Sequence, residues 1–230
     1  MITREEQWGE VMVVPPPQRQ GVSWEDPELP GWLGFYRTLR DLLVRPGDFF
    51  ENLGAGGWAE PLSFALIVST AGLGFSLFWD LLILAGGAAS NAAKLASSLN
   101  LGAEWLMALM IATPFLVLVD LAVGGLCWWG SLALAGAGRE FTPGWRIFCY
   151  AQGGMVMAAI PILGSLVAAI WVLALMYFGA KRMFRLSALS ALGSLAIFLT
   201  FEIGLGILLL LGLIVCLVGL AGLNFLALLG

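Results

Sequence analysis

The chain has 230 residues, of which 60% are hydrophobic and only 11% are charged, and its formal net charge is −4. A soluble domain carries about 25% charged residues, so this composition excludes an ordinary water-soluble domain. It indicates an integral membrane protein whose main solvent is lipid. There is no basic stripe in the sequence, so we do not expect nucleic-acid binding.

The sequence also offers little material for catalysis. It contains no histidine, which removes the commonest general base and a common metal ligand. A phosphate-binding P-loop and a GxSxG nucleophile motif are absent as well. We therefore expect a protein that is not an enzyme and that has no metal site and no cofactor.

Residues 1–30 contain the stretches VVPPPQRQG and EDPELP. Three consecutive prolines disfavour a helix and favour an extended polyproline conformation. We predict a disordered, proline-rich cytoplasmic tail over these residues. A plain linker is the simpler interpretation, and a polyproline ligand is the alternative.

Residues 31–60 have the period of an amphipathic helix. Arg37 and Arg40 lie largely opposite the apolar positions. Pro46 disfavours the helical region for the residue before it, so PGDFFENL begins a second short helix. We expect these helices to lie in the plane of the membrane interface, and the alternative is docking on the protein's own membrane domain. The apolar positions are Trp32, Phe35, Tyr36, Leu39, Leu42 and Leu43.

The remaining residues, 61–230, contain apolar runs long enough to cross a bilayer, which takes ~20 residues for ~30 Å of hydrocarbon. The fold class expected is therefore all-α, a polytopic transmembrane helical bundle of about five spans. The third and fourth spans form a short hairpin that turns at Pro161 and Gly164. Two tight spans within 187–230 are the alternative, because no charge marks a turn there. The predicted spans are about 61–85, 105–135, 147–162, 164–180 and 187–212.

The distribution of positive charge predicts the orientation. If the N-terminus is cytoplasmic, only Lys94 falls on the outer side, as the positive-inside rule favours. The residues on the inner side are then Arg37, Arg40, Arg45, Arg139, Arg146, Lys181, Arg182 and Arg185.

Three carboxylates lie within the apolar runs: Asp80, Asp120 and Glu202. Acids inside a membrane are costly and are functional candidates by default. Asp80 lies near the outer end of the first span, where a wet helix end explains it. Asp120 and Glu202 should lie near mid-depth without a basic residue, so we expect them to be neutral or hydrogen-bonded. They form either a polar clasp between helices, worth ~0.6–2 kcal/mol, or a proton or cation site.

Two stretches carry an ordered set of loose motifs: WED through LGFYRTLRDLLVRPGDFFENL to PLSFAL, and TPGWRIFCYAQGG through to KRMFRLS. The second has a tyrosine early in span three (Tyr150), a proline and a glycine at the hairpin (Pro161, Gly164) and a tryptophan in span four (Trp171). In order and spacing they resemble the bacterial branch of the Yip-domain family (Ypt-interacting proteins) over roughly residues 24–200.

That resemblance implies a cytoplasmic N-terminus, five spans, no known catalytic chemistry and a location in the bacterial cytoplasmic membrane. Eukaryotic members of the family act in vesicle traffic between the ER and the Golgi and engage prenylated Rab GTPases. This chain departs from their pattern, because it has only WAEPL where they carry an acidic-aromatic-Gly-Pro motif. GTPase binding is therefore not carried over.

The sequence leads to one functional hypothesis and two alternatives. The first is a Yip-like scaffold or adaptor in membrane organisation or trafficking, whose partners are the lipid bilayer and other membrane proteins or a second copy of the chain. The second is a small transporter or proton- or cation-conducting protein that uses Asp120 and Glu202. The third is an accessory subunit of a larger membrane complex.

Overall fold

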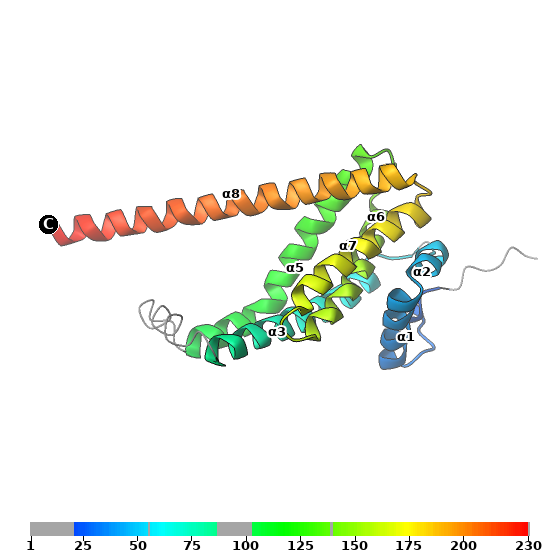
Figure 1. Cartoon of the computed structure of the whole chain (residues 1–230), viewed down its shortest axis with the longest axis horizontal. Coiled ribbons are helices and arrows are strands. Elements are labelled where there is room, and N and C mark those ends of the chain that lie inside the picture. Colours follow the sequence, from blue (N-terminus) through cyan, green and yellow to red (C-terminus); the bar gives the residue numbers. More distant parts are fainter. Residues whose placement is uncertain (1–20, 55, 87–102, 139, 230) are drawn as a thin grey trace, which may run out of the picture.

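The computed structural model describes residues 21–54, 56–86, 103–138 and 140–229, although not the side chains of 80, 81, 83–86, 103–110, 213, 214 and 216–229. Within these ranges the chain is all-helical, as the sequence predicts (Figure 1). Elements labelled η are 3-10 helices. In chain order the elements are η1 (Ser23–Glu25), α1 (Gly31–Val44), α2 (Pro46–Asn52), α3 (Ala59–Gly86), α5 (Ala103–Leu134), α6 (Phe141–Ala151), η2 (Gln152–Ala159), α7 (Gly164–Met183) and α8 (Ala188–Leu229).

Four helices in the described part of the chain are long and apolar enough to cross a membrane. They agree with the expected integral membrane protein, because each has about the 20 residues that a crossing needs. The apolar stretches, with mean hydropathy between 1.6 and 2.3, are Ala59–Trp79, Ile111–Leu134, Gly164–Met183 and Ala188–Gly212.

The segment predicted as a third span, 147–162, differs from that prediction because it is not one continuous α-helix. The α-helix α6 ends at Ala151, and the chain continues as the 3-10 helix η2 to Ala159. Since a 3-10 helix rises about 2.0 Å per residue and an α-helix about 1.5 Å, the two together extend about 32 Å. Pro161 follows in the turn to α7, where Ile162 has a φ of 68°.

The 3-10 helix η2 packs between α3 and α7 at very short backbone distances. A Cβ atom at Gly72 of α3 would stand 2.6 Å from the carbonyl oxygen of Met155. One at Gly154 would stand 2.9 Å from the backbone nitrogen of Val172 in α7. These approaches require glycine, and small residues are typical of close helix packing in membranes.

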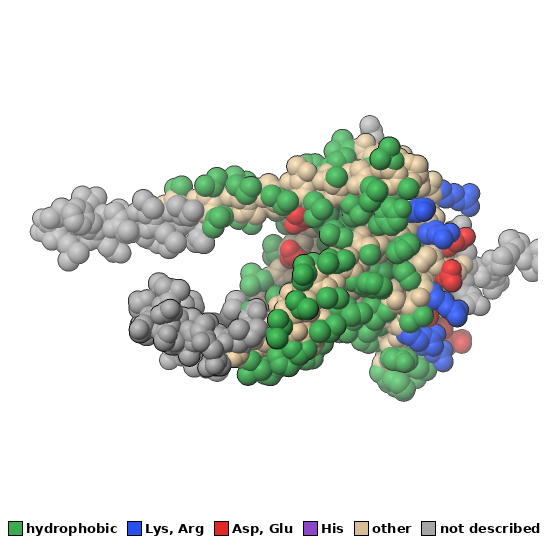
Figure 2. Space-filling model, in the orientation of Figure 1, with side chains coloured by type: hydrophobic (Ala, Val, Ile, Leu, Met, Phe, Trp, Pro, Cys, Tyr) green, Lys and Arg blue, Asp and Glu red, His purple; other side chains and the backbone are tan. Residues whose placement is uncertain are grey.

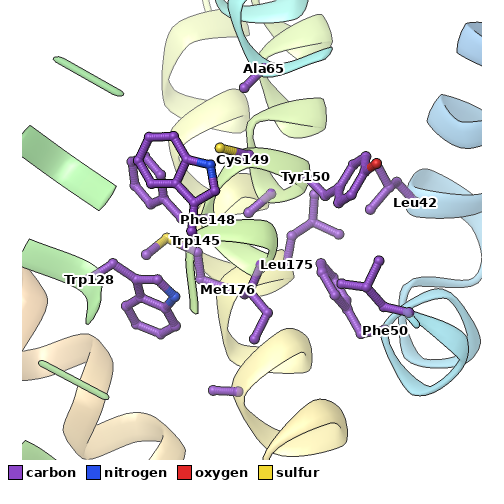
Figure 3. Packing of buried hydrophobic residues seen from close by; sticks show 14 of the residues in the cluster. Leu42, Phe50, Ala65, Trp128, Trp145, Phe148, Cys149, Tyr150, Leu175 and Met176 are labelled. Atoms are coloured by element: carbon purple, nitrogen blue, oxygen red, sulfur yellow. The ribbon is translucent and has the colours of Figure 1, made fainter. Parts of the chain in front are cut away.

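The buried core surrounds α6, in which every residue from Gly144 to Ala151 is buried. Leu42 and Phe50, from α1 and α2, lie on one side of it, and Trp128 of α5 lies on the other (Figure 3). Leu42 and Phe50 are both fully buried. Burial of a side chain of this kind contributes about 1.5–3 kcal/mol, so it holds α1 and α2 on the ends of the longer helices.

Most of α8 lacks such packing within the described chain. Near its start Phe198 contacts Trp128, with ring centroids 5.8 Å apart, but the helix then extends away from the other elements (Figure 1). In the apolar 18-residue portion of this helix only 6% of the residues are buried, against 28–33% in the corresponding portions of the other three. The exposed large hydrophobic side chains of α8 are Leu189, Leu192, Leu199, Phe201, Ile203, Ile207, Leu208, Leu209, Leu210, Leu211 and Val215.

The last part of the predicted tail, residues 22–30, also differs from the expectation. Val22 is buried, Ser23–Glu25 forms η1, and η1 packs on α1. The proline-rich composition did not predict this structure, because Val22 and Trp24 pack against the rest of the protein. Residues 1–20 of the predicted tail lie outside the described residues.

Candidate functional site

Lysine and arginine side chains gather at one end of the molecule (Figure 2). A buried ion pair joins α6 to the N-terminal segment. Arg146 of α6 and Glu25 of η1 approach to 2.8 Å between Nη2 and Oε1, and their side chains are only 2% and 18% exposed. Tyr150, one turn later on the same helix, donates its hydroxyl to the Glu25 carboxylate at 2.5 Å. Glu25, Arg146 and Tyr150 form one cluster, which we call the Glu25 tie.

The Glu25 tie also reaches the loop before α3. Arg146 Nη1 donates to the carbonyl oxygen of Gly57 at 3.0 Å, while its Nε is buried without a hydrogen-bond partner. Burying two charges is costly unless they are paired and hydrogen-bonded, and removal of one partner leaves the other uncompensated. The tie therefore makes the position of residues 22–30 depend on α6.

Trp24, next to Glu25, fixes the same segment by further contacts. Its indole nitrogen donates to the carbonyl oxygen of Glu60 at 2.8 Å, and its backbone N–H donates to Thr38 Oγ1 at 2.9 Å. Its ring meets that of Phe35 edge-on, with centroids 6.0 Å apart. The segment is therefore bound to α1, to the start of α3 and to α6 at once.

The predicted interface helix α1 divides its apolar positions between two environments. Phe35 and Leu39 pack against the buried core, whereas Trp32 and Tyr36 are 74% and 57% exposed. Arg37 is exposed. Arg40 is exposed as well, and it pairs with Asp41 at 2.8 Å. One part of the face is therefore docked on the protein and the other part is exposed.

The four residues of the family pattern do not meet in one site. Tyr150 points from α6 toward Leu42 of α1 (Figure 3) and belongs to the Glu25 tie. Pro161 and Gly164 lie in and after the turn at the far end of the hairpin, where a Cβ at Gly164 would stand 2.8 Å from the Met157 carbonyl oxygen. Trp171 packs on the core, and its indole nitrogen has no hydrogen-bond partner.

Two of the three predicted intramembrane acids lie on neighbouring helices. Glu202 Oε1 of α8 would lie 3.5 Å from a Cβ atom at Gly124 of α5, and Asp120 is one turn before Gly124 on the same helix. No hydrogen bond joins them in the described structure: Asp120 is exposed, and Glu202 Oε1 is buried without a partner. Figure 2 shows acidic side chains in the wedge between α5 and α8, away from the basic end. The side chain of Asp80 lies outside the described ones.

The sequence did not predict that Glu25 and Arg146 form a site. It placed Glu25 in the disordered tail and Arg146 just before the third span, on the cytoplasmic side. One feature of the sequence could have indicated the site. An arginine lies at the edge of an apolar run with a tyrosine one turn later, and a buried arginine requires an acidic partner. The sequence does not indicate which distant acid supplies it.

Among the residues that the structure describes, no group of three or more histidine, cysteine or acidic side chains comes together as a metal site. The chain matches no family model, no curated protein and no solved structure. The likeness to Yip-domain proteins therefore stays a prediction from motifs, and the site has to be interpreted from its own geometry.

Proposed function

We propose that this protein is a non-enzymatic membrane scaffold or adaptor that associates laterally with other membrane proteins, or with a second copy, through α8. The observation that carries the proposal is the contrast in packing between α8 and the other apolar helices. Its stretch Ala188–Gly212 has the highest mean hydropathy, 2.3, and an 18-residue portion of it has the smallest buried share, 6%. A helix with so few contacts inside its own chain has a large surface for contacts outside it.

A shallow apolar groove beside α8 supports the same role. It lies between α5 and α8 and is lined by residues such as Cys127, Phe201 and Leu208. A partner helix in this groove would cover apolar surface, and close helix packing of this kind drives association in membranes.

The proposed topology has five spans with the N-terminus in the cytoplasm. The length of α6 and η2 together, about 32 Å, supports a fifth crossing in addition to the four long helices. Positive charge at one end of the molecule supports the orientation, and the exposed rings of Trp32 and Tyr36 support contact of α1 with the bilayer surface. The role in membrane organisation that the resemblance to Yip-domain proteins implies is part of this proposal.

Site-specific photo-crosslinking in native membranes tests the scaffold role. A photoreactive residue at Leu208 of α8, which is 66% exposed, should yield discrete crosslinked protein bands. The matched control is Phe115 of α5, 70% exposed on another apolar helix, where lipid adducts should dominate. A diffuse pattern that is the same at both positions would exclude α8 as a specific association surface.

A second candidate function, proton or cation conduction, is favoured by the position of Asp120 and Glu202 on adjoining apolar helices. Ionisable groups within transmembrane segments mark ion pathways in many membrane proteins. Flux into sealed liposomes should then be measurable for the natural chain and disappear in the double variant Asp120→Asn and Glu202→Gln. Absence of flux in both proteins, with normal folding of the variant, leaves the two acids with a packing or association role.

A further inference from the structure

A pocket with a basic rim lies where α2 meets the end of α7 and the turn to α8. Its volume is about 260 Å³, and its lining includes Phe50, Leu53, Lys181, Arg182, Arg185 and Leu186. Phe50 and Leu53 lie beneath it, fully buried, whereas the three basic side chains are exposed. The accessible surface of the pocket is therefore mainly polar and positively charged, with the half-buried Met183 and Leu186 as its apolar edge.

The positive charge of this rim is largely uncompensated. Glu51, which also lines the pocket, pairs with Arg182 at 3.3 Å, with side chains 62% and 49% exposed. Such an exposed pair is worth at most about 1 kcal/mol. Lys181 lies over the ring of Tyr177 at 5.8 Å, and within the described chain neither Lys181 nor Arg185 forms an ion pair. One carboxylate thus faces three cations.

The backbone at Arg185 adds a second observation. Its φ is 52°, a left-handed conformation that is uncommon for a residue other than glycine. Strained conformations of this kind cluster at ligand sites and switch regions. At this position the conformation shapes the turn that carries the third cation at the pocket edge.

We propose that this pocket binds a phosphate-bearing anion, and that the headgroup of an anionic phospholipid is its occupant. Arginine and lysine are the side chains that bind phosphate oxygens, and basic pockets between transmembrane helices on the cytoplasmic side bind anionic headgroups. The half-buried side chains of Met183 and Leu186 offer the glycerol part of a lipid a small apolar contact. Free phosphate shares the charge chemistry but not the apolar part, and this difference separates the two sources.

The first experiment compares ligands on the natural, full-length chain. The protein in mild detergent is mixed with equal amounts of phosphatidylglycerol and phosphatidylcholine, and bound lipids are counted by native mass spectrometry. The anionic lipid should be preferred by about tenfold or more, since each nearby lysine or arginine strengthens binding about fivefold. A parallel titration with inorganic phosphate, in nanodiscs of phosphatidylcholine alone, identifies free phosphate if that is the occupant. Binding of neither anion overturns the proposal.

The second experiment locates the binding. The triple variant Lys181→Gln, Arg182→Gln and Arg185→Gln should lose the preference for phosphatidylglycerol. A control triple, Arg37→Gln, Arg40→Gln and Arg45→Gln, removes the same charge from α1 and the start of α2 and should keep most of it. Equal losses in the two triples would show general surface attraction and would overturn the pocket.

A single substitution that should increase lipid binding separates a specific effect on the pocket from misfolding. Glu51→Gln removes the only carboxylate that lines the pocket and leaves all three cations in place. Anionic lipid binding should increase by a few fold, because Arg182 no longer has a competing partner. A merely structural role for these side chains would not raise the affinity, so an unchanged or lower preference in Glu51→Gln counts against the proposal.

Discussion

The end of the molecule around α6 and the long helix α8 obey different packing rules. Around α6, polar and aromatic groups from η1, α1, α3 and α6 meet, and Arg146 is 1% exposed. In α8 the buried side chains are Ala191, Ser194 and Phe198, near its start, and most of the described side chains after them are exposed. The first region is held by many specific contacts, whereas α8 makes such contacts mainly near its start. Hydropathy therefore does not show which helix is packed.

The glycines show the same difference. In the packed region, a Cβ at Gly72 or Gly154 would collide with backbone atoms of a neighbouring segment. At the four described glycines of α8, which are Gly193, Gly204, Gly206 and Gly212, a Cβ would meet nothing within 4 Å. Glycine is therefore required in one region and is free to change in the other.

Loss of the buried arginine should have the largest effect. Arg146→Leu leaves Glu25 without its cation, and breaking a buried pair costs about 3–5 kcal/mol. Reversible unfolding in mixed detergent and SDS micelles measures the free energy of unfolding. The exposed pair offers the matched control, because Arg182→Leu should cost no more than about 1 kcal/mol.

A second change tests whether the charge or the packing matters in the Glu25 tie. The double variant Glu25→Leu and Arg146→Leu should recover much of the loss, because replacing both charges with apolar groups is often close to neutral. If the double variant is as unstable as Arg146→Leu alone, the two side chains do not act as a pair.

A glycine substitution in α3 should come next in size. Gly72→Ala places a methyl group against the Met155 carbonyl oxygen, and overpacking of this kind costs about 1–3 kcal/mol. Gly74→Ala, half a turn away, meets nothing within 4 Å and should leave the free energy of unfolding nearly unchanged. Similar results for the two variants would contradict the close approach of α3 and η2.

A smaller effect is expected for Tyr150→Phe. The change keeps the ring on Phe49 and Phe64, whose centroids lie 5.4 Å away in each case, and removes only the hydroxyl that donates to Glu25. A hydrogen bond to a charged group contributes about 1.5–3 kcal/mol, and neutral ones about 0.5–1.5 kcal/mol, so the loss should stay near 1–2 kcal/mol. Limited proteolysis should also detect earlier cleavage in residues 22–30.

The smallest effect should occur in α8. Gly204→Ala adds a methyl group in open space, and alanine is favoured over glycine inside a helix by up to about 1 kcal/mol. Stability in detergent should therefore be unchanged or slightly higher. A clear loss of stability in native membranes, but not in detergent, would instead indicate a partner packed against this helix.

Periodicity and hydropathy predict much of the fold. Helices occur over Gly31–Val44 and Pro46–Asn52, where the apolar period and Pro46 indicate them, and the long apolar helices follow the apolar runs. These features depend on residues close together in the chain. The 3-10 winding of η2 was not predicted, because it arises from contacts with both α3 and α7.

The site was less predictable than the fold for the same reason. The intramembrane acids are visible in the sequence as charges in apolar runs, but their environment depends on how α5 and α8 diverge. The Glu25 tie joins side chains 121 residues apart, and nothing local to Glu25 indicates its partner. Tyr150 was singled out only through a motif, without its bonding partner.

The long chain separation within the Glu25 tie has a consequence for biosynthesis. Ribosomes add about 5–20 residues per second, so Glu25 is made roughly 6–24 s before Arg146. During that interval η1 lacks its cation, while α3 and α5 are already being inserted. The N-terminal segment can therefore complete its docking only after α6 has been synthesised and has reached its position.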